Sequence, residues 1–170
     1  MSYFVLGSAI ALAVVFLVSG ISKVRDWPAF LESTAQLLPP GSLPVTPVAW
    51  VVVVAEFAAV ALMPVVPALG LGLAALLLIA FGIATAVAVR RGQRAACRCF
   101  GALSGRPLGV GHVVRNGVLA VLALSALLAL FRGGALHPAG IVLAVVGGSV
   151  VAALVVLGDD IADLFVPDRL

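Results

Sequence analysis

The chain has 170 residues, of which 64% are hydrophobic and 10% are charged, and its mean hydropathy is +1.29. This composition excludes an ordinary soluble domain and predicts an all-α, polytopic integral membrane protein surrounded by membrane lipid. The formal net charge of +3 comes mostly from arginines outside the apolar runs, which suits anionic headgroups and argues against nucleic acid as a partner. We expect a single transmembrane domain over residues 1–170.

Five apolar runs are long enough to cross a bilayer, and the expected fold is a helix bundle with a four-helix core. About 20 helical residues cover the hydrocarbon thickness of ~30 Å. Between the first two spans, Trp27 and Pro28 open a mixed stretch that predicts a short helix along the membrane surface. Residues 158–170 are expected to form a short amphipathic cap. The expected spans are about residues 3–21, 48–63, 68–89, 112–131 and 138–157.

The basic residues are unequally distributed between the two sides of the membrane that five spans define. Arg132 alone falls on one side. Loops rich in Lys and Arg stay in the cytoplasm. The pattern therefore predicts a multi-pass protein of the cell membrane with its N-terminus outside and the loop 90–111 in the cytoplasm. The nine basic residues on that cytoplasmic side are Lys23, Arg25, Arg90, Arg91, Arg94, Arg98, Arg106, Arg115 and Arg169.

Both cysteines lie in the loop 90–111, one residue apart, in the stretch Cys97-Arg98-Cys99-Phe100-Gly101. Residues i and i+2 face different sides of a helix, but in a turn their Cα atoms can approach to the ~4.4–6.8 Å that a disulfide needs. The arginines nearby favour the thiolate, which is the reactive form in disulfide exchange. The stretch predicts a redox-active disulfide, with Cys97 and Cys99 as the reacting residues and Arg98 beside them.

Two other interpretations of the cysteines stay open. With His112 they offer three ligands to a soft metal, but a fourth ligand and a recognisable zinc spacing are missing, so we expect no bound metal. The cysteines can also be small buried apolar residues without chemistry. His112 can act instead as a base beside the loop.

Polar residues in or next to the spans are candidates for supporting roles. Glu56 lies halfway along the second span and should face the bundle interior, because an ionised group in hydrocarbon is costly unless paired or hydrated. It can handle protons for thiol chemistry, or lock two helices through an ion pair with Lys23 or Arg115. Ser19 and Lys23 can close hydrogen bonds at the end of the first helix, and Lys23 can equally extend to the surface. Arg115 and Asn116, near the cysteine loop, can bind Glu56 or steady a thiolate.

Several of these residues together resemble the MauE family of methylamine utilisation membrane proteins, which is related to the DoxX-like redox-associated membrane proteins. The likeness covers about residues 3–131. The family's cysteine motif often reads Cys-Gly-Cys-Phe-Gly, and here Arg98 takes the place of the glycine, which we expect to stiffen the turn and alter the thiol potential. The residues that carry the resemblance are Ser19-Gly20-Ile21-Ser22-Lys23, Glu56, the cysteine stretch, His112 and Arg115-Asn116.

The resemblance implies a role in the maturation of an extracytoplasmic, disulfide-containing client protein, which in the methylamine system is the small subunit of methylamine dehydrogenase. It implies a thioredoxin-like partner with which Cys97 and Cys99 exchange electrons, either as a thiol–disulfide oxidoreductase or as an electron carrier. Apart from the redox-active disulfide no bound cofactor is expected. A cytoplasmic dithiol reaches the outer face by a rocking motion or hands its electrons to a quinone, and no motif supports the quinone. The alternative function is a non-catalytic assembly factor or chaperone for the partner or the client.

Overall fold

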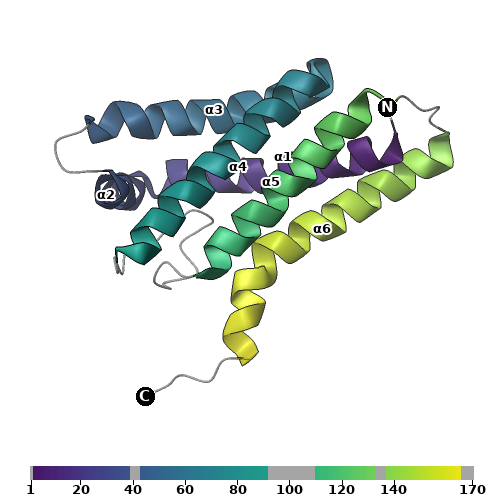
Figure 1. Ribbon diagram of the computed structural model, residues 1–170. Coiled ribbons are helices and arrows are strands. Elements are labelled where there is room, and N and C mark those ends of the chain that lie inside the picture. Colours follow the sequence, from purple (N-terminus) through teal and green to yellow (C-terminus); the bar gives the residue numbers. More distant parts are fainter. Residues whose placement is uncertain (1, 39–42, 92–109, 133–136, 166–170) are drawn as a thin grey trace.

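The computed structural model describes residues 2–38, 43–91, 110–132 and 137–165 (Figure 1). Within these ranges the chain forms six helices and no strand, which confirms the predicted all-α class. All of them except the second contain a stretch long and apolar enough to cross a membrane. In chain order the helices are α1 (Tyr3–Arg25), α2 (Trp27–Leu37), α3 (Val45–Val65), α4 (Pro67–Arg90), α5 (Val110–Leu130) and α6 (Pro138–Phe165).

α1 and α6 run well past the C-terminal ends that their apolar composition predicts, and α3 also begins earlier, at Val45. α1 continues past residue 21 to Arg25, because lysine and arginine are good helix formers and the chain first meets a stop at Asp26, shortly before Pro28. This extension keeps Lys23 on the helix. α6 continues through Gly158 to Phe165, so residues 158–165 of the expected cap are helical and continue the helix of the last span.

The four-helix core is a closed ring of α1, α3, α4 and α5, as predicted. α1 packs against α3 and α5, and α4 packs against the same two helices from the other side. Lipid tails are as apolar as leucine, so helices in a membrane associate mainly through close contact between small side chains. Alanines fill much of this core, and those with no more than 3% of their surface exposed include Ala11, Ala59, Ala74, Ala75, Ala123 and Ala126.

In the hairpin of α3 and α4 the two helix backbones are in close contact. Val66 is the one residue between them, flanked by Pro64 in the last turn of α3 and by Pro67 at the start of α4. A Cβ atom at Gly70 would lie 2.5 Å from the backbone nitrogen of Met63 and 2.7 Å from its Cα. The backbone of α4 therefore rests directly on that of α3, and only glycine fits at this position.

α6 lies outside the ring and packs along α1 (Figure 1). The two backbones come close at small residues, since a Cβ at Gly7 would lie 3.2 Å from the carbonyl oxygen of Ala144. At the start of α6, the backbone N–H of His137 donates to the hydroxyl oxygen of Tyr3 over 2.7 Å. The opposite face of α6 is exposed and aliphatic, as expected for contact with lipid.

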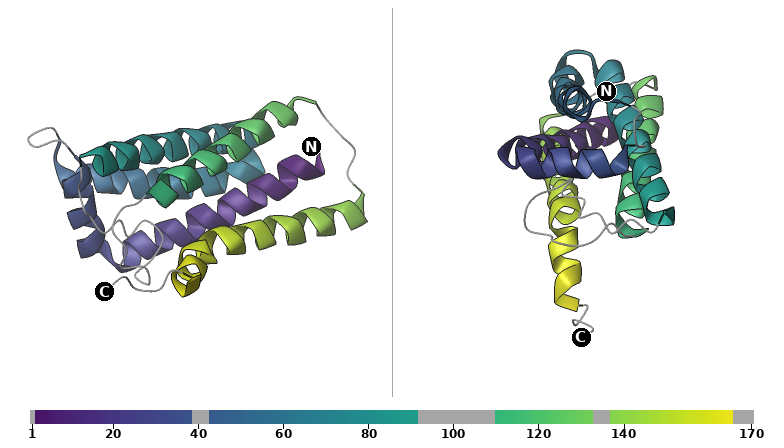
Figure 2. Two further views of the ribbon diagram at one scale, coloured as in Figure 1. Left: turned by 60° about the horizontal axis from the view of Figure 1, so that its bottom comes forward. Right: turned by 90° about the vertical axis from the view of Figure 1, so that its left-hand side faces the viewer.

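α2 runs crosswise at one end of the bundle (Figures 1 and 2). We call this end, where α1 and α4 finish and α3 and α5 begin, the α2 end. Trp27 stacks on Trp50 with 4.7 Å between ring centroids and contacts Phe30 at 5.8 Å. Aromatic side chains of this kind anchor a helix at the membrane interface, in agreement with the short surface helix predicted from the sequence.

Candidate functional site

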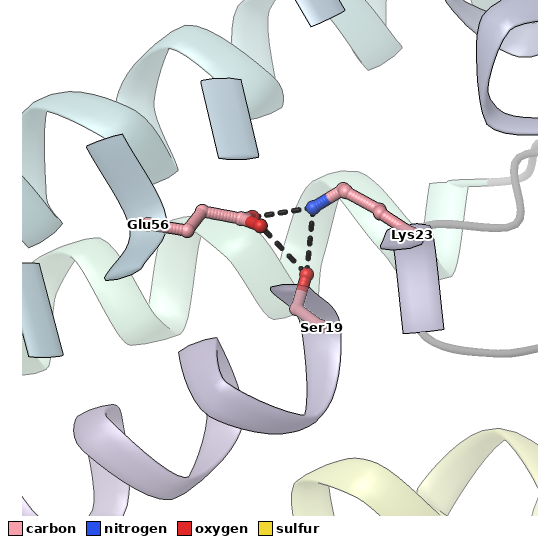
Figure 3. Close-up of polar contacts among 3 residues, drawn as sticks. All are labelled: Ser19, Lys23 and Glu56. Atoms are coloured by element: carbon pink, nitrogen blue, oxygen red, sulfur yellow. Dashed lines mark hydrogen bonds and ion pairs between the residues drawn. The ribbon is translucent and has the colours of Figure 1, made fainter. Parts of the chain in front are cut away.

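A buried polar cluster joins α1 to α3 inside the α2 end. Lys23 and Glu56 have 1% and 0% of their surface exposed. The Lys23 ammonium forms an ion pair with Glu56 Oε1 and donates a hydrogen bond of 2.7 Å to Ser19 Oγ. The Ser19 hydroxyl in turn donates to the same carboxylate oxygen over 3.1 Å (Figure 3). Each of the three side chains therefore contacts the other two.

The helix geometry of α1 explains why Lys23 points inward. Ser19 and Lys23 are four residues apart, so both project from the same face of the helix. That face turns toward α3, where Glu56 lies in the middle of the helix. Of the two cations considered from the sequence, the structure pairs Lys23 with Glu56, and the Lys23 side chain does not extend to the surface.

Two aromatic rings complete the surroundings of the Lys23 ammonium. Its nitrogen lies 4.9 Å from the ring centroid of Phe81 in α4 and 5.6 Å from that of Phe30 in α2. A cation within about 6 Å of a ring face is attracted by the ring's quadrupole. Through this one ammonium the cluster links α1, α2, α3 and α4, and the attraction helps to offset the cost of removing a charge from water.

Asn116 brings α5 into the same region. A small cavity of about 10 Å³, close to the size of one water molecule, is lined by Ser19, Lys23, Glu56 and Asn116 together with apolar side chains. Asn116 is itself buried. Glu56 Oε2 has no hydrogen-bond partner among the residues that the structure describes. Glu56 and Asn116 therefore border the same small cavity.

The remaining predicted residues divide into two groups. His112 and Arg115 lie on the first two turns of α5, both half-buried, at the α2 end. Cys97, Arg98 and Cys99 lie outside the described residues. α4, which precedes the cysteine loop, ends at Arg90 and α5, which follows it, begins at Val110; both of these helix ends belong to the α2 end. The loop is thus attached at the end that holds the polar cluster.

Sequence reasoning did not find the two phenylalanines around Lys23. Phe30 and Phe81 stand among many apolar residues, and nothing local distinguishes a ring that faces a cation from one that faces lipid. The only signal is indirect: a lysine buried in a span requires partners on the neighbouring helices.

These features define the class of the protein: a multi-pass membrane helix bundle with a buried ion pair near one end. The family model for the methylamine utilisation protein MauE matches residues 1–131, and the chain belongs to the MauE family. The matched segment contains α1 to α5 and ends before α6. Membership suggests a membrane protein tied to methylamine dehydrogenase maturation. Searches of curated proteins and of solved structures returned no match to the chain.

Proposed function

We propose that this protein is a membrane thiol–disulfide redox protein that supports the maturation of a disulfide-containing protein outside the cytoplasm. The observation that carries the proposal is the position of the cysteine pair in the chain. Cys97 and Cys99 connect α4 to α5, two helices packed side by side, at the end of the bundle that holds the Lys23–Glu56 cluster. Family membership supports methylamine dehydrogenase as the client.

The chemistry is a two-step exchange with a thioredoxin-like partner. The thiolate of one cysteine attacks the partner's disulfide, forms a mixed disulfide and releases one partner thiolate. The second cysteine then attacks the mixed disulfide, which forms the Cys97–Cys99 bond and releases the partner's other thiolate. Two electrons pass to the partner, and the two thiol protons balance its two thiolates. The reverse direction follows the same steps.

In this scheme the buried cluster has a supporting role. The ion pair between Lys23 and Glu56 fixes α1 to α3, and Asn116 borders the same cavity from α5, the helix that follows the cysteine loop. Because these helices are fixed relative to one another, the two ends of the cysteine loop are also held in fixed positions. Glu56 has a second role in proton handling, because oxidation of a dithiol releases protons and reduction of a disulfide consumes them.

A thiol-trapping titration tests the proposal. Membranes containing the full chain are equilibrated with dithiol buffers of graded potential, alkylated with a mass tag and resolved by gel. We expect Cys97 and Cys99 to become protected together in one two-electron step, and the Cys97→Ser and Cys99→Ser variants each to stay fully alkylated at their single thiol. Absence of an intramolecular disulfide across the whole potential range would overturn the redox mechanism.

Client maturation separates the redox mechanism from the alternative, a non-catalytic assembly factor. We expect the Cys97→Ser/Cys99→Ser double variant to insert normally and to yield no mature client. Mature client at the unaltered level in cells carrying this double variant would favour the assembly factor. The Leu76→Ala variant, at a position 62% exposed on α4, is the matched control for insertion.

A further inference from the structure

A second and larger cavity lies between α2, α3 and α4 and is separate from the ion pair. It has a volume of about 210 Å³ and reaches the outer surface at Ala80, which is exposed. Apolar side chains form most of its lining, among them Phe30, Val52, Phe81 and Ala84. A dry cavity of roughly 150 Å³ holds one benzene ring, so this volume suits a single substituted ring with a tail leaving through the open side.

The polar side chains in the lining are three hydroxyls from two helices. Each of them donates to a carbonyl oxygen four residues earlier: Ser33 to Ala29 over 3.0 Å, Thr34 to Phe30 over 2.8 Å and Thr85 to Phe81 over 2.7 Å. A hydroxyl rotates, so it can accept from a ligand in this arrangement or donate to a ligand after turning. No charged side chain borders this cavity within the described part of the chain, so it favours a neutral ligand.

Two of the walls also border the buried ion pair. Phe30 and Phe81 line the cavity, and the same two rings lie within 5.6 Å and 4.9 Å of the Lys23 ammonium. Ring walls favour a flat ligand, because aromatic groups gain from offset or edge-to-face packing beyond the apolar area they bury. The cavity thus combines aromatic and aliphatic walls with neutral hydroxyls that can donate or accept hydrogen bonds.

We propose that this cavity binds the ring of a lipid-soluble quinone and of the corresponding quinol, with the tail in the bilayer. The carbonyl oxygens of a quinone accept hydrogen bonds from the cavity's hydroxyls, and the hydroxyls of a quinol donate to the same oxygens. One set of side chains therefore serves both oxidation states. A ligand with a permanent charge would lose its hydration without gaining a counter-ion here.

A redox role for the bound quinone rests on the proposed function, whereas binding of the quinone to this cavity does not. Oxidation of the Cys97 and Cys99 thiols to a disulfide releases two electrons and two protons, and reduction of one quinone to its quinol consumes both. If the cysteines face the cytoplasm, as the basic residues predict, the quinol carries their electrons into the membrane, and the cysteine loop need not move.

Tryptophan fluorescence measures the binding directly. Of the two tryptophans in the chain, Trp27 contacts the cavity wall at Phe30, and Trp50 contacts Trp27. The purified full chain in lipid nanodiscs is titrated with decylubiquinone. We expect saturable quenching of the fluorescence in the unaltered protein, and competition by decylubiquinol at similar concentrations.

Three variants assign the quenching to this cavity. Ala84→Phe fills the space, and Thr34→Val/Thr85→Val removes two hydroxyls at nearly unchanged shape, so each should weaken binding about tenfold or more. Leu76→Phe, on the exposed face of the same helix, is the matched control and should bind within about twofold of the unaltered protein. Circular dichroism checks that all three are folded.

Two outcomes would overturn the proposal. Quenching that rises linearly and equally in Ala84→Phe would mean that the quinone only partitions into the lipid. Competition by n-decanol at the concentrations at which decylubiquinol competes would mean a site for alkyl chains without selection for a ring. The Cys97→Ser/Cys99→Ser variant should bind decylubiquinone unchanged, so failure of the thiol titration and failure of the binding test are distinguishable.

Discussion

At the scale of single residues, the Lys23–Glu56 pair shows how a charged pair is kept inside a membrane. Each charge has left water, which costs several kcal/mol, and the partner, Ser19 and two rings offset that cost only while all are present. Removing one partner leaves the other as an uncompensated charge, whereas removing both leaves an apolar contact. The variant that lacks one partner and the variant that lacks both should therefore differ strongly in their free energy of unfolding.

A double-mutant cycle at this pair tests that argument. Glu56→Leu should lower the free energy of unfolding by about 3–5 kcal/mol, because Lys23 is then buried without a counter-charge. Lys23→Met/Glu56→Leu should recover most of the loss. The measurement is unfolding by sodium dodecyl sulfate in mixed micelles, followed by circular dichroism.

Ser8→Ala serves as the control for the cycle, since Ser8 is buried in α1 and does not line the cavity of the pair. It should cost less than about 1.5 kcal/mol, the contribution of one ordinary hydrogen bond. The free energy lost in the double variant is compared with the sum of the losses in Glu56→Leu and Lys23→Met. Equality of the two would show that Lys23 and Glu56 contribute to stability independently, which would contradict a coupled ion pair.

At the scale of helices, the α3–α4 hairpin depends on direct contact between backbones. Gly70 sits where any Cβ atom would meet the backbone of Met63, and a backbone cannot move aside as a flexible side chain can. Gly72 lies two residues later in the same helix, and a Cβ atom added there would have nothing within 4 Å. The two glycines have the same local sequence context and opposite structural requirements.

The pair of variants Gly70→Ala and Gly72→Ala separates packing from helix propensity. Gly70→Ala should lower the free energy of unfolding by about 1–3 kcal/mol, because α3 and α4 must move apart to admit the methyl group. Gly72→Ala should leave it unchanged or raise it by up to about 1 kcal/mol, because alanine is the better helix former and the added methyl group meets no neighbour. The same detergent titration measures both, and equal effects of the two substitutions would contradict the close approach at Gly70.

At the scale of the whole molecule, α1 begins at the end of the bundle opposite the α2 end, so a bundle that crosses the membrane exposes these two ends on opposite sides. The described basic residues at helix ends follow this division, with Arg25, Arg90 and Arg91 at the α2 end and Arg132 at the other. Lys23 also belongs to the α2 end but is buried in an ion pair. The orientation predicted from the sequence therefore depends on the arginines.

Cysteine labelling tests this orientation. In the Cys97→Ser/Cys99→Ser background, a single cysteine replaces an exposed residue at either end: Gln36 in α2, or Val65 and Phe131 at the opposite end. A membrane-impermeant maleimide should label the Val65→Cys and Phe131→Cys variants in intact cells, and the Gln36→Cys variant only after permeabilisation. Labelling in the reverse order would place the cysteine loop outside, next to an extracytoplasmic client.

The sequence was sufficient for the number of spans and for the inward direction of Glu56, and it was insufficient for the helix ends. An apolar run of about 20 residues and the cost of a buried acid are local properties that can be counted along the chain. The last turn of α1 is not apolar, so hydropathy ended the helix before Lys23 although helix propensity continues it to Arg25.

The residues around the ion pair and the larger cavity could be identified only from the three-dimensional structure. Choosing between Lys23 and Arg115 as the partner of Glu56 depends on how α1 and α5 are rotated about their axes, which no residue spacing determines. Thr85 and the Ser33–Thr34 pair were visible as polar residues in apolar surroundings, but their convergence on one cavity follows only from the crossing of α2 over α4.

The arrangement of α1 also has a consequence for biosynthesis. α1 is made first, yet it contacts α2, α3, α4, α5 and α6, and half of its membrane-spanning window is buried, the largest share among the five spans. Its lysine therefore enters the bilayer before Glu56 does. Lys23 lies close enough to the helix end for its side chain to reach the headgroups in the meantime. Because α3 precedes α4, α5 and α6 in the chain, the ion pair between α1 and α3 can close before the remaining helices pack around it.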